Sequence, residues 1–225
     1  MYSLNLSDYL IRIQQDGLKI DTVYDIGAND GTWSNAMRNA ELKNSYFYLF
    51  EGNPDHEPNL LRTGLPYYIG ILSNPGRKSV DYYKGGSGTG NSYYKENTVF
   101  YDNAVPVQLG ARTLESLVSE CEMPIPNFIK IDTQGSELDI LRGAESILTK
   151  VDLVYLECPI GKYNLGAPNI QEYLEYMASQ HFIPSDLLEI HTAEHVLVQV
   201  DIMFINIATK DRLYGVNHNN RYINY

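Results

Sequence analysis

The chain has 225 residues and a net charge of −11, from 17 basic and 28 acidic residues, and 44% of its residues are hydrophobic. This composition excludes a disordered chain, and no run of Lys or Arg offers the basic face that nucleic acids or anionic membranes attract. No signal-peptide pattern and no apolar stretch near the ~20 residues that span a bilayer is visible. We therefore expect a single cytoplasmic domain over residues 1–225, without nucleic-acid or membrane partners.

Short apolar runs alternate with helical segments along the chain. The runs expected to be strands are Thr22–Ile26, Tyr46–Phe50, Tyr67–Leu72, Phe128–Ile131, Leu153–Leu156 and Val200–Ile207. The segments expected to be helices are residues 1–20, Trp33–Ala40, Ser136–Thr149 and a helix that begins at Asn169. Apolar runs without polar alternation are typical of strands covered on both faces, so the pattern predicts an α/β fold with a doubly wound, mostly parallel sheet.

Two polar segments interrupt this pattern. Residues 85–103 are rich in Gly, Ser and Tyr, and residues 209–225 form a polar tail to which the sequence assigns no role. Loops as long as the first segment are often lids or binding loops in compact domains, although a plain surface loop has the same composition. We expect residues 85–103 to contribute to a binding site.

The turn after the first strand is the most informative local feature. The string V-Y-D-I-G-A-N-D-G-T-W-S contains Asp25, Gly27, Asn29 and Gly31 and leads into a helix. Glycines let a backbone approach a ligand closely, and Asp25 favours a ligand with a cationic group over a bare phosphate. S-adenosylmethionine carries such a cation. The alternative is an ordinary turn of an α/β domain, but a NAD site is disfavoured because Asn29 replaces the second glycine of the dinucleotide fingerprint.

Polar residues also follow the other expected strands, where ligands bind in doubly wound sheets. Glu51 stands 24 residues after Gly27, a spacing at which an acid can bind ribose hydroxyls. Ser73 and Asn74 could bind an adenine edge. Asp132 and Glu157 end the later strands. Any one of these residues could be a solvated strand end, but their recurrence at successive strands favours a shared site.

Three strings resemble the FkbM-type methyltransferase family: F-E-G-N-P, A-R-T-L-E-S-L and N-F-I-K-I-D-T-Q-G-S-E-L-D-I-L-R-G-A. The resemblance runs from about Val23 to Ile207, with Gly52 at a usual proline and Gln134 at a usual glutamate. It implies a Rossmann-like class I methyltransferase sheet of seven strands with an antiparallel last strand. It also implies S-adenosylmethionine as methyl donor and a hydroxyl acceptor on a sugar, glycan or small natural product.

The resemblance also implies roles for individual residues. Asp25, Gly27 and Gly31 would form the cofactor turn, with Asn29 between the glycines. Glu51 would hold the ribose, with Asn53 nearby. The remaining assignments place Ser73 near the adenine and Asp132 at the methionine end or the acceptor.

Methyl transfer to a hydroxyl needs a base or a metal to remove the proton. Asp132 and Glu157 could act together as bases or hold a cation; alternatively Asp132 only orients the donor's amine and Glu157 caps a loop. His195 is a further candidate base, and its spacing of four from His191 is that of helical metal pairs, although surface histidines are common. Neither cysteine has a partner at metal-finger spacing, and the two carboxylates lack a third ligand, so no metal site is predicted.

Two other functions stay open. The chain could be a non-catalytic module that binds S-adenosylmethionine, but Asp25, Glu51 and Asp132 are all present, which disfavours a decayed site. It could also methylate RNA or protein. The net charge disfavours RNA, and D-T-Q-G stands where an amine-methylating enzyme would carry an N-P-P-Y-type motif.

Overall fold

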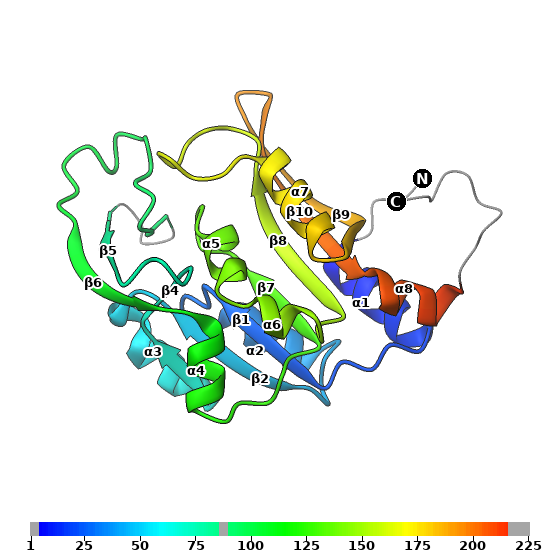
Figure 1. Cartoon of the computed structure of the whole chain (residues 1–225). Coiled ribbons are helices and arrows are strands. Elements are labelled where there is room, and N and C mark those ends of the chain that lie inside the picture. The colour runs from blue at the N-terminus through cyan, green and yellow to red at the C-terminus, as the bar shows by residue number, and fades with distance from the viewer. Residues whose placement is uncertain (1–4, 86–89, 216–225) are drawn as a thin grey trace.

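The structure is a computed structural model that describes residues 5–85 and 90–215 (Figure 1). Its centre is a seven-stranded sheet with the strand order β3-β2-β1-β7-β8-β10-β9. In this order the strands are β3 (Tyr67–Ile69), β2 (Tyr46–Glu51), β1 (Thr22–Ile26), β7 (Phe128–Ile131), β8 (Leu153–Pro159), β10 (Val196–Asn206) and β9 (Phe182–Ala193). Strand β10 is antiparallel to β8 and β9, whereas the other neighbours pair in parallel. The predicted fold class is confirmed.

Helices cover both faces of this sheet (Figure 1). They are α1 (Leu6–Gln15), α2 (Thr32–Asn39), α3 (Glu57–Thr63), α4 (Leu114–Glu120), α5 (Glu137–Arg142), α6 (Glu145–Leu148), α7 (Ile170–Ser179) and α8 (Ile207–Tyr214). Side chains alternate along β1, so that Tyr24 and Ile26 pack with α4–α7 while Val23 packs with α1, α2, α3 and α8. The apolar strands are therefore buried on both sides, as their composition predicts. Within the described residues no helix is both long and apolar enough to cross a membrane.

Two expected elements are divided in the structure. The run Tyr67–Leu72 is split at Gly70, where the Gly70 N–H donates to the Glu51 carbonyl and the chain leaves the main sheet. Strand β4 (Ile71–Leu72) then joins β5 (Ser79–Tyr82) and β6 (Val107–Arg112) in a small second sheet. The helix expected over Ser136–Thr149 is interrupted at Gly143, where a Cβ would lie 2.3 Å from the Ser73 carbonyl oxygen.

The first and last described helices differ in length from the expected elements. The first helix is shorter than residues 1–20, and residues 1–4 lie outside the described part. Residues 209–214 belong to α8 instead of a polar tail, while 216–225 are outside the described residues. Thr209 is buried, and its hydroxyl donates to the Asp152 carboxylate, which also pairs with Arg212 at 2.9 Å. This buried anchor explains why α8 continues past Thr209.

The segment predicted to be a binding loop lies against α5. Residues 86–89 of the predicted loop 85–103 are outside the described part; the remainder is irregular, yet Tyr93 is buried. The phenol groups of Tyr93 and Tyr94 donate to Oδ2 of Asp139 on α5, at 3.3 and 2.8 Å. Arg77 and Arg142 also pair with this carboxylate, each at 3.3 Å. Asp139 therefore fastens the segment to the helix.

We expect Asp139→Asn to loosen this segment, because the amide keeps the shape but removes the charge that faces two arginines. The free energy of unfolding should fall by about 1–3 kcal/mol. Amide hydrogen exchange should become faster over residues 90–103. The control is Asp102→Asn, an exposed acid in the same segment. Unchanged exchange in Asp139→Asn would show that other contacts hold the segment.

Candidate functional site

A pocket lies at the carboxyl ends of the central parallel strands. Gly27, Glu51, Asp132 and Glu157, which follow or end β1, β2, β7 and β8, line it. The other wall comes from the small sheet and the segment between its strands β5 and β6, with Ile71, Leu72, Tyr82, Asn91, Ser92 and Tyr93. This is the edge of a doubly wound sheet at which ligands bind. Four strand ends that are far apart in sequence thus form one site.

Glycine is required where the turns after β1 and β7 cross. Gly27 has a φ of +79°, and a Cβ there would lie 1.8 Å from the carbonyl oxygen of Asp132. Asn29 also has a positive φ, +50°, and lines the pocket. Gly31 begins α2 against Thr63, where a Cβ would lie 2.6 Å from its methyl group. Gly27 and Asn29 therefore face the pocket, and Gly31 allows close packing beneath it.

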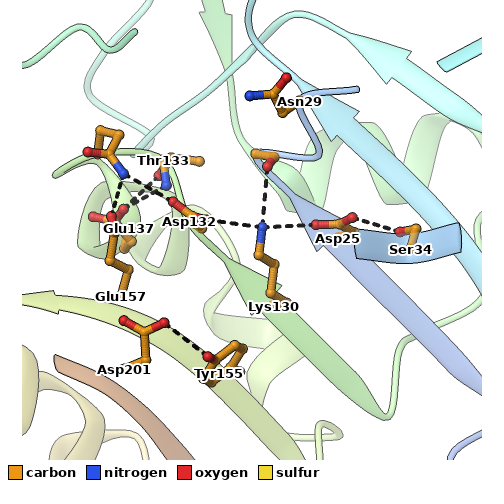
Figure 2. Close-up of polar contacts among 12 residues, drawn as sticks. Asp25, Asn29, Ser34, Lys130, Asp132, Thr133, Glu137, Tyr155, Glu157 and Asp201 are labelled. Atoms are coloured by element: carbon orange, nitrogen blue, oxygen red, sulfur yellow. Dashed lines mark hydrogen bonds and ion pairs between the residues drawn. The ribbon is translucent and has the colours of Figure 1, made fainter. Parts of the chain in front are cut away.

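Asp25 pairs with a cation of the chain itself. Its side chain is fully buried, and Oδ1 lies 3.2 Å from Nζ of Lys130 while Oδ2 accepts from Ser34 at 2.6 Å (Figure 2). Nζ also donates to the Gly27 carbonyl at 3.3 Å and lies 3.4 Å from Asp132. Asp25 is thus paired with Lys130 and is absent from the residues that line the pocket, whereas the sequence predicts a direct contact with the ligand.

Lys130 is the central residue that the sequence reasoning missed. Its one signal is a charged residue inside the apolar string F-I-K-I. Burial lowers the pKa of Lys130, but the carboxylates of Asp25 and Asp132 outweigh it and raise the pKa above its ordinary value. The group of Lys130, Asp25 and Asp132 has a formal charge of −1. Of its two acids, only Asp132 lines the pocket. The pocket therefore presents negative charge at this end.

Glu51 is held by backbone N–H groups at the end of β2. It is 8% exposed, and its two oxygens accept from the amides of Asn29 and Asn53 at 2.8 and 2.7 Å. Burial raises the pKa of Glu51, whereas these two hydrogen bonds lower it. Each carboxylate oxygen keeps a second lone pair for a ligand hydroxyl. Glu51 is thus fixed in place but still able to accept.

Three of the predicted contact residues, Asn53, Ser73 and Asn74, are absent from the pocket lining and bind other groups of the protein. Asn53 is buried, and its side chain caps the 3₁₀ turn Pro54–His56 by accepting from the Asp55 amide. The Ser73 hydroxyl is 3.2 Å from the phenol oxygen of Tyr93. Asn74 donates to Asp139 at 2.9 Å. The neighbours Leu72, Tyr93 and His56 line the pocket instead, because sequence spacing places a strand end but not the direction of each side chain.

Asp132 and Glu157 do meet at the pocket, as predicted (Figure 2). The side-chain amide of Gln134 joins them by donating to Glu157 at 2.7 Å and to Asp132 at 3.2 Å. Burial first, and then the neighbouring carboxylates of Asp132, Glu137 and Asp201, raise the pKa of Glu157 well above its ordinary value. Asp132 and Glu157 thus place two carboxyl groups at the pocket, of which the Glu157 carboxyl group is the more deeply buried.

A second residue that the sequence did not single out, the acid Glu137, shapes the turn after β7. Glu137 is fully buried, and one of its oxygens accepts from the amides of Thr133 and Gly135 at 2.8 and 3.2 Å. Its other oxygen accepts from the hydroxyl of Tyr173 at 2.5 Å. Burial raises the pKa of Glu137. In the sequence it reads only as an acid in the first turn of a helix, a position that needs no special role.

His195 does not reach the pocket. Residues 182–206 contain two antiparallel strands, so a spacing of four does not place His191 and His195 on one helical face. His195 is exposed in the turn between these strands, with a φ of +65°. The arrangement gives no support to His195 as a base. Among the histidines of the described residues, His56 lines the pocket, and the sequence did not single it out.

Comparisons with known proteins agree with this architecture. The Methyltransferase FkbM domain matches residues 25–184. The chain is 25% identical over 166 residues to the hexuronic acid methyltransferase AglP of Haloferax volcanii, an alignment that covers 68% of this chain and 62% of that protein. The match thus spans less than two thirds of that relative's length.

Two solved structures share the fold. One is methyltransferase FkbM from Methylobacillus flagellatus KT, with a TM-score of 0.51, 15% identity, and coverage of 88% of this chain and 48% of that one. The other is the magnesium protoporphyrin IX methyltransferase of Synechocystis PCC 6803 with bound SAM, with a TM-score of 0.50, 7% identity, and coverage of 88% and 74%. The family match includes every strand end that lines the pocket, and the chain belongs to the FkbM methyltransferase domain family.

Proposed function

We propose that this chain transfers the methyl group of S-adenosylmethionine to a hydroxyl group of a sugar, glycan or small natural product. The observation that carries the proposal is the placement of Gly27, Glu51 and Asp132 around one pocket in a chain of a methyltransferase family. The distant similarity to a hexuronic acid methyltransferase supports a sugar acceptor weakly.

The chemistry of the pocket fits the proposed donor. Glu51 offers free lone pairs to a ribose diol, and the negative end at Asp132 suits a cationic amine or sulfonium. The apolar side chains of Phe50, Ile71 and Leu72 line the same pocket and suit the faces of an adenine ring. When bound, the sulfonium supplies an electrophilic methyl group. The protein's part is to align the acceptor and to take its hydroxyl proton.

The two carboxyl groups joined by Gln134 are the candidates for that proton transfer. The Asp132 side chain is 43% exposed and lies at the pocket surface, which suits a base that must reach an acceptor. Glu157 is more enclosed, and its raised pKa suits a group that keeps its proton longer and hydrogen-bonds the acceptor. We therefore assign the base to Asp132 and the positioning of the acceptor to Glu157.

The other two functions find less support. A non-catalytic binding module does not need a second carboxyl group at the pocket, whereas Glu157 stands beside Asp132. An RNA methyltransferase needs a basic surface, and the chain carries a net charge of −11. An assay with radiolabelled methyl donor over sugars, glycans, RNA and protein separates these possibilities. Transfer to none of them, by a chain that binds the donor, would favour the binding module.

We expect Glu51→Ala to weaken binding of S-adenosylmethionine and of its demethylated product. The loss should be about 1–3 kcal/mol, because ribose hydroxyls and two backbone amides lose their acceptor. Calorimetry measures it, with Glu57→Ala, an exposed acid on α3, as control. Tight binding of NAD by the parent, with neither sulfur ligand bound, would contradict the proposed donor.

We expect Asp132→Asn to remove turnover and to weaken binding of the donor by a much smaller factor, because Glu51 still binds the donor. The amide keeps the shape of the side chain but is no longer a base. Single-turnover methyl transfer and calorimetry on the same variant measure the two quantities. A parallel loss of donor affinity would mean that Asp132 only binds the donor's ammonium group, and normal turnover would remove it from the mechanism.

The raised pKa of Glu157 makes stability depend on pH. A carboxyl group whose pKa is higher in the folded than in the unfolded state stabilises the fold at low pH, and this stabilisation is lost as the pH rises through the folded-state pKa. Glu157→Gln should therefore be more stable than the parent at neutral pH. The difference should disappear below the ordinary pKa of glutamate. Urea unfolding across this range tests it, with the exposed Glu175→Gln as control; a constant difference would contradict the raised pKa.

A further inference from the structure

Three metal-ligating side chains meet on the hairpin of β9 and β10, outside the pocket-lining set. Glu189 and His191 come from β9, and Asp201 comes from β10. One ligand atom from each lies within 4.8 Å of the other two. Nε2 of His191 is 3.6 Å from Oδ1 of Asp201 and 3.7 Å from Oε2 of Glu189. The imidazole nitrogen therefore stands between two carboxylates.

The strand register brings these residues together. Asp201 and Glu189 are direct partners across the ladder, and His191 is paired with Gln199, the residue two positions before Asp201. Residues two apart on a strand point to the same face, so Glu189 and His191 share a face of the hairpin. The pairing of the two strands thus sets the spacing of Glu189, His191 and Asp201. This spacing does not depend on side-chain rotamers alone.

The spacing fits a tetrahedral ion. Zinc binds imidazole nitrogen and carboxylate oxygen at about 2.0–2.2 Å, which for tetrahedral angles places neighbouring ligand atoms about 3.4 Å apart. The two distances from His191 are within a few tenths of an ångström of that value. They are longer than the ~2.7–3.2 Å of an N–H···O hydrogen bond. The third pair, the carboxylates of Glu189 and Asp201, lies within 4.8 Å, and the exposed Glu189 side chain is free to close this separation around an ion.

A hydrogen bond from outside the group orients Asp201. Its Oδ2 accepts from the hydroxyl of Tyr155 on β8 at 2.9 Å (Figure 2). Its Oδ1 faces His191. Oδ1 also accepts a longer bond from Gln199 at 3.3 Å. Carboxylates that bind metals are commonly held in this way by an outer hydrogen bond. The Asp201 side chain is only 15% exposed, so one ligand of the group is rigidly placed.

We propose that Glu189, His191 and Asp201 bind a divalent transition-metal ion, with Zn²⁺ as the ion that the distances fit. One imidazole and two carboxylates are a ligand set that such ions accept. The side chains of His191 and Glu189 are 43% and 55% exposed, which leaves a fourth position open to water. The ion would join β9 to β10 beside the register shift at Asp201 and Ile202. This site does not depend on the proposed methyl transfer.

The test is metal binding by the full chain after chelator treatment and dialysis. We expect Zn²⁺ to bind with a stoichiometry of one by calorimetry, and Co²⁺ to give a visible absorption spectrum of low coordination number that Zn²⁺ abolishes. Zn²⁺ should also raise the Tm, because it binds the folded chain. His191→Ala should weaken binding at least tenfold, remove the cobalt spectrum and abolish the rise in Tm.

His195→Ala is the matched control, since it removes an exposed histidine from the turn of the same hairpin. It should bind Zn²⁺ like the parent. Glu189→Gln, also at an exposed position, should weaken binding and keep the metal-free Tm, which shows that the fold is intact. The proposal would be overturned if the parent bound no Zn²⁺ or if His191→Ala bound it as tightly as the parent. It would also be overturned if His191→Ala and His195→Ala lost the same amount of Zn²⁺ affinity.

Discussion

The buried ammonium group of Lys130 is the interaction on which the pocket depends. Lys130 on β7 and Asp25 on β1 are direct partners in the ladder, so their side chains meet on one face of the sheet. A buried charge is tolerated only when it is paired, and removal of one partner from such a pair typically destabilises by about 3–5 kcal/mol. Nζ also reaches the Gly27 carbonyl and the Asp132 carboxylate. One cation therefore ties together the two turns that form the floor of the pocket.

This arrangement also sets the charge of the pocket. Because Lys130 is already shared by two acids, further carboxylates at the same edge must be held by neutral donors. Two glutamine amides fill this role: Gln134 donates to Asp132 and Glu157, and Gln199 donates to Glu157 and Asp201. Each amide satisfies two carboxylates without cancelling their charge. The chain thus keeps a row of negatively charged side chains from the pocket towards the hairpin of β9 and β10. A lysine or an arginine in place of either glutamine would have neutralised part of this charge.

The general position of the site could be predicted from sequence because parallel strands end at one edge of a sheet. Gly27, Asn29, Glu51, Asp132 and Glu157 were expected from that rule, and all five line the pocket. The direction in which each side chain points was less predictable than the position of its residue at a strand end. Asp25, Asn53, Ser73 and Asn74 follow the same rule but are absent from the pocket lining, because their side chains are taken up by Ser34, the Asp55 amide, Tyr93 and Asp139. Strand β9 was not predicted as a separate strand, because Pro184 and the polar residues after it hide its apolar pattern.

The antiparallel strand β10 connects the pocket with the hairpin. The side-chain amide of Gln199, near the start of β10, donates to Glu157 through Nε2 and accepts from the hydroxyl of Tyr163 through Oε1 at 2.8 Å. Two residues further on, Asp201 turns one oxygen to Tyr155 and the other to His191. The backbone that places Gln199 beside the pocket therefore also places Asp201 in the proposed metal site. An ion that held β9 and β10 together would restrict the movement of Gln199, and through it would help to keep the Glu157 carboxyl group in position at the pocket.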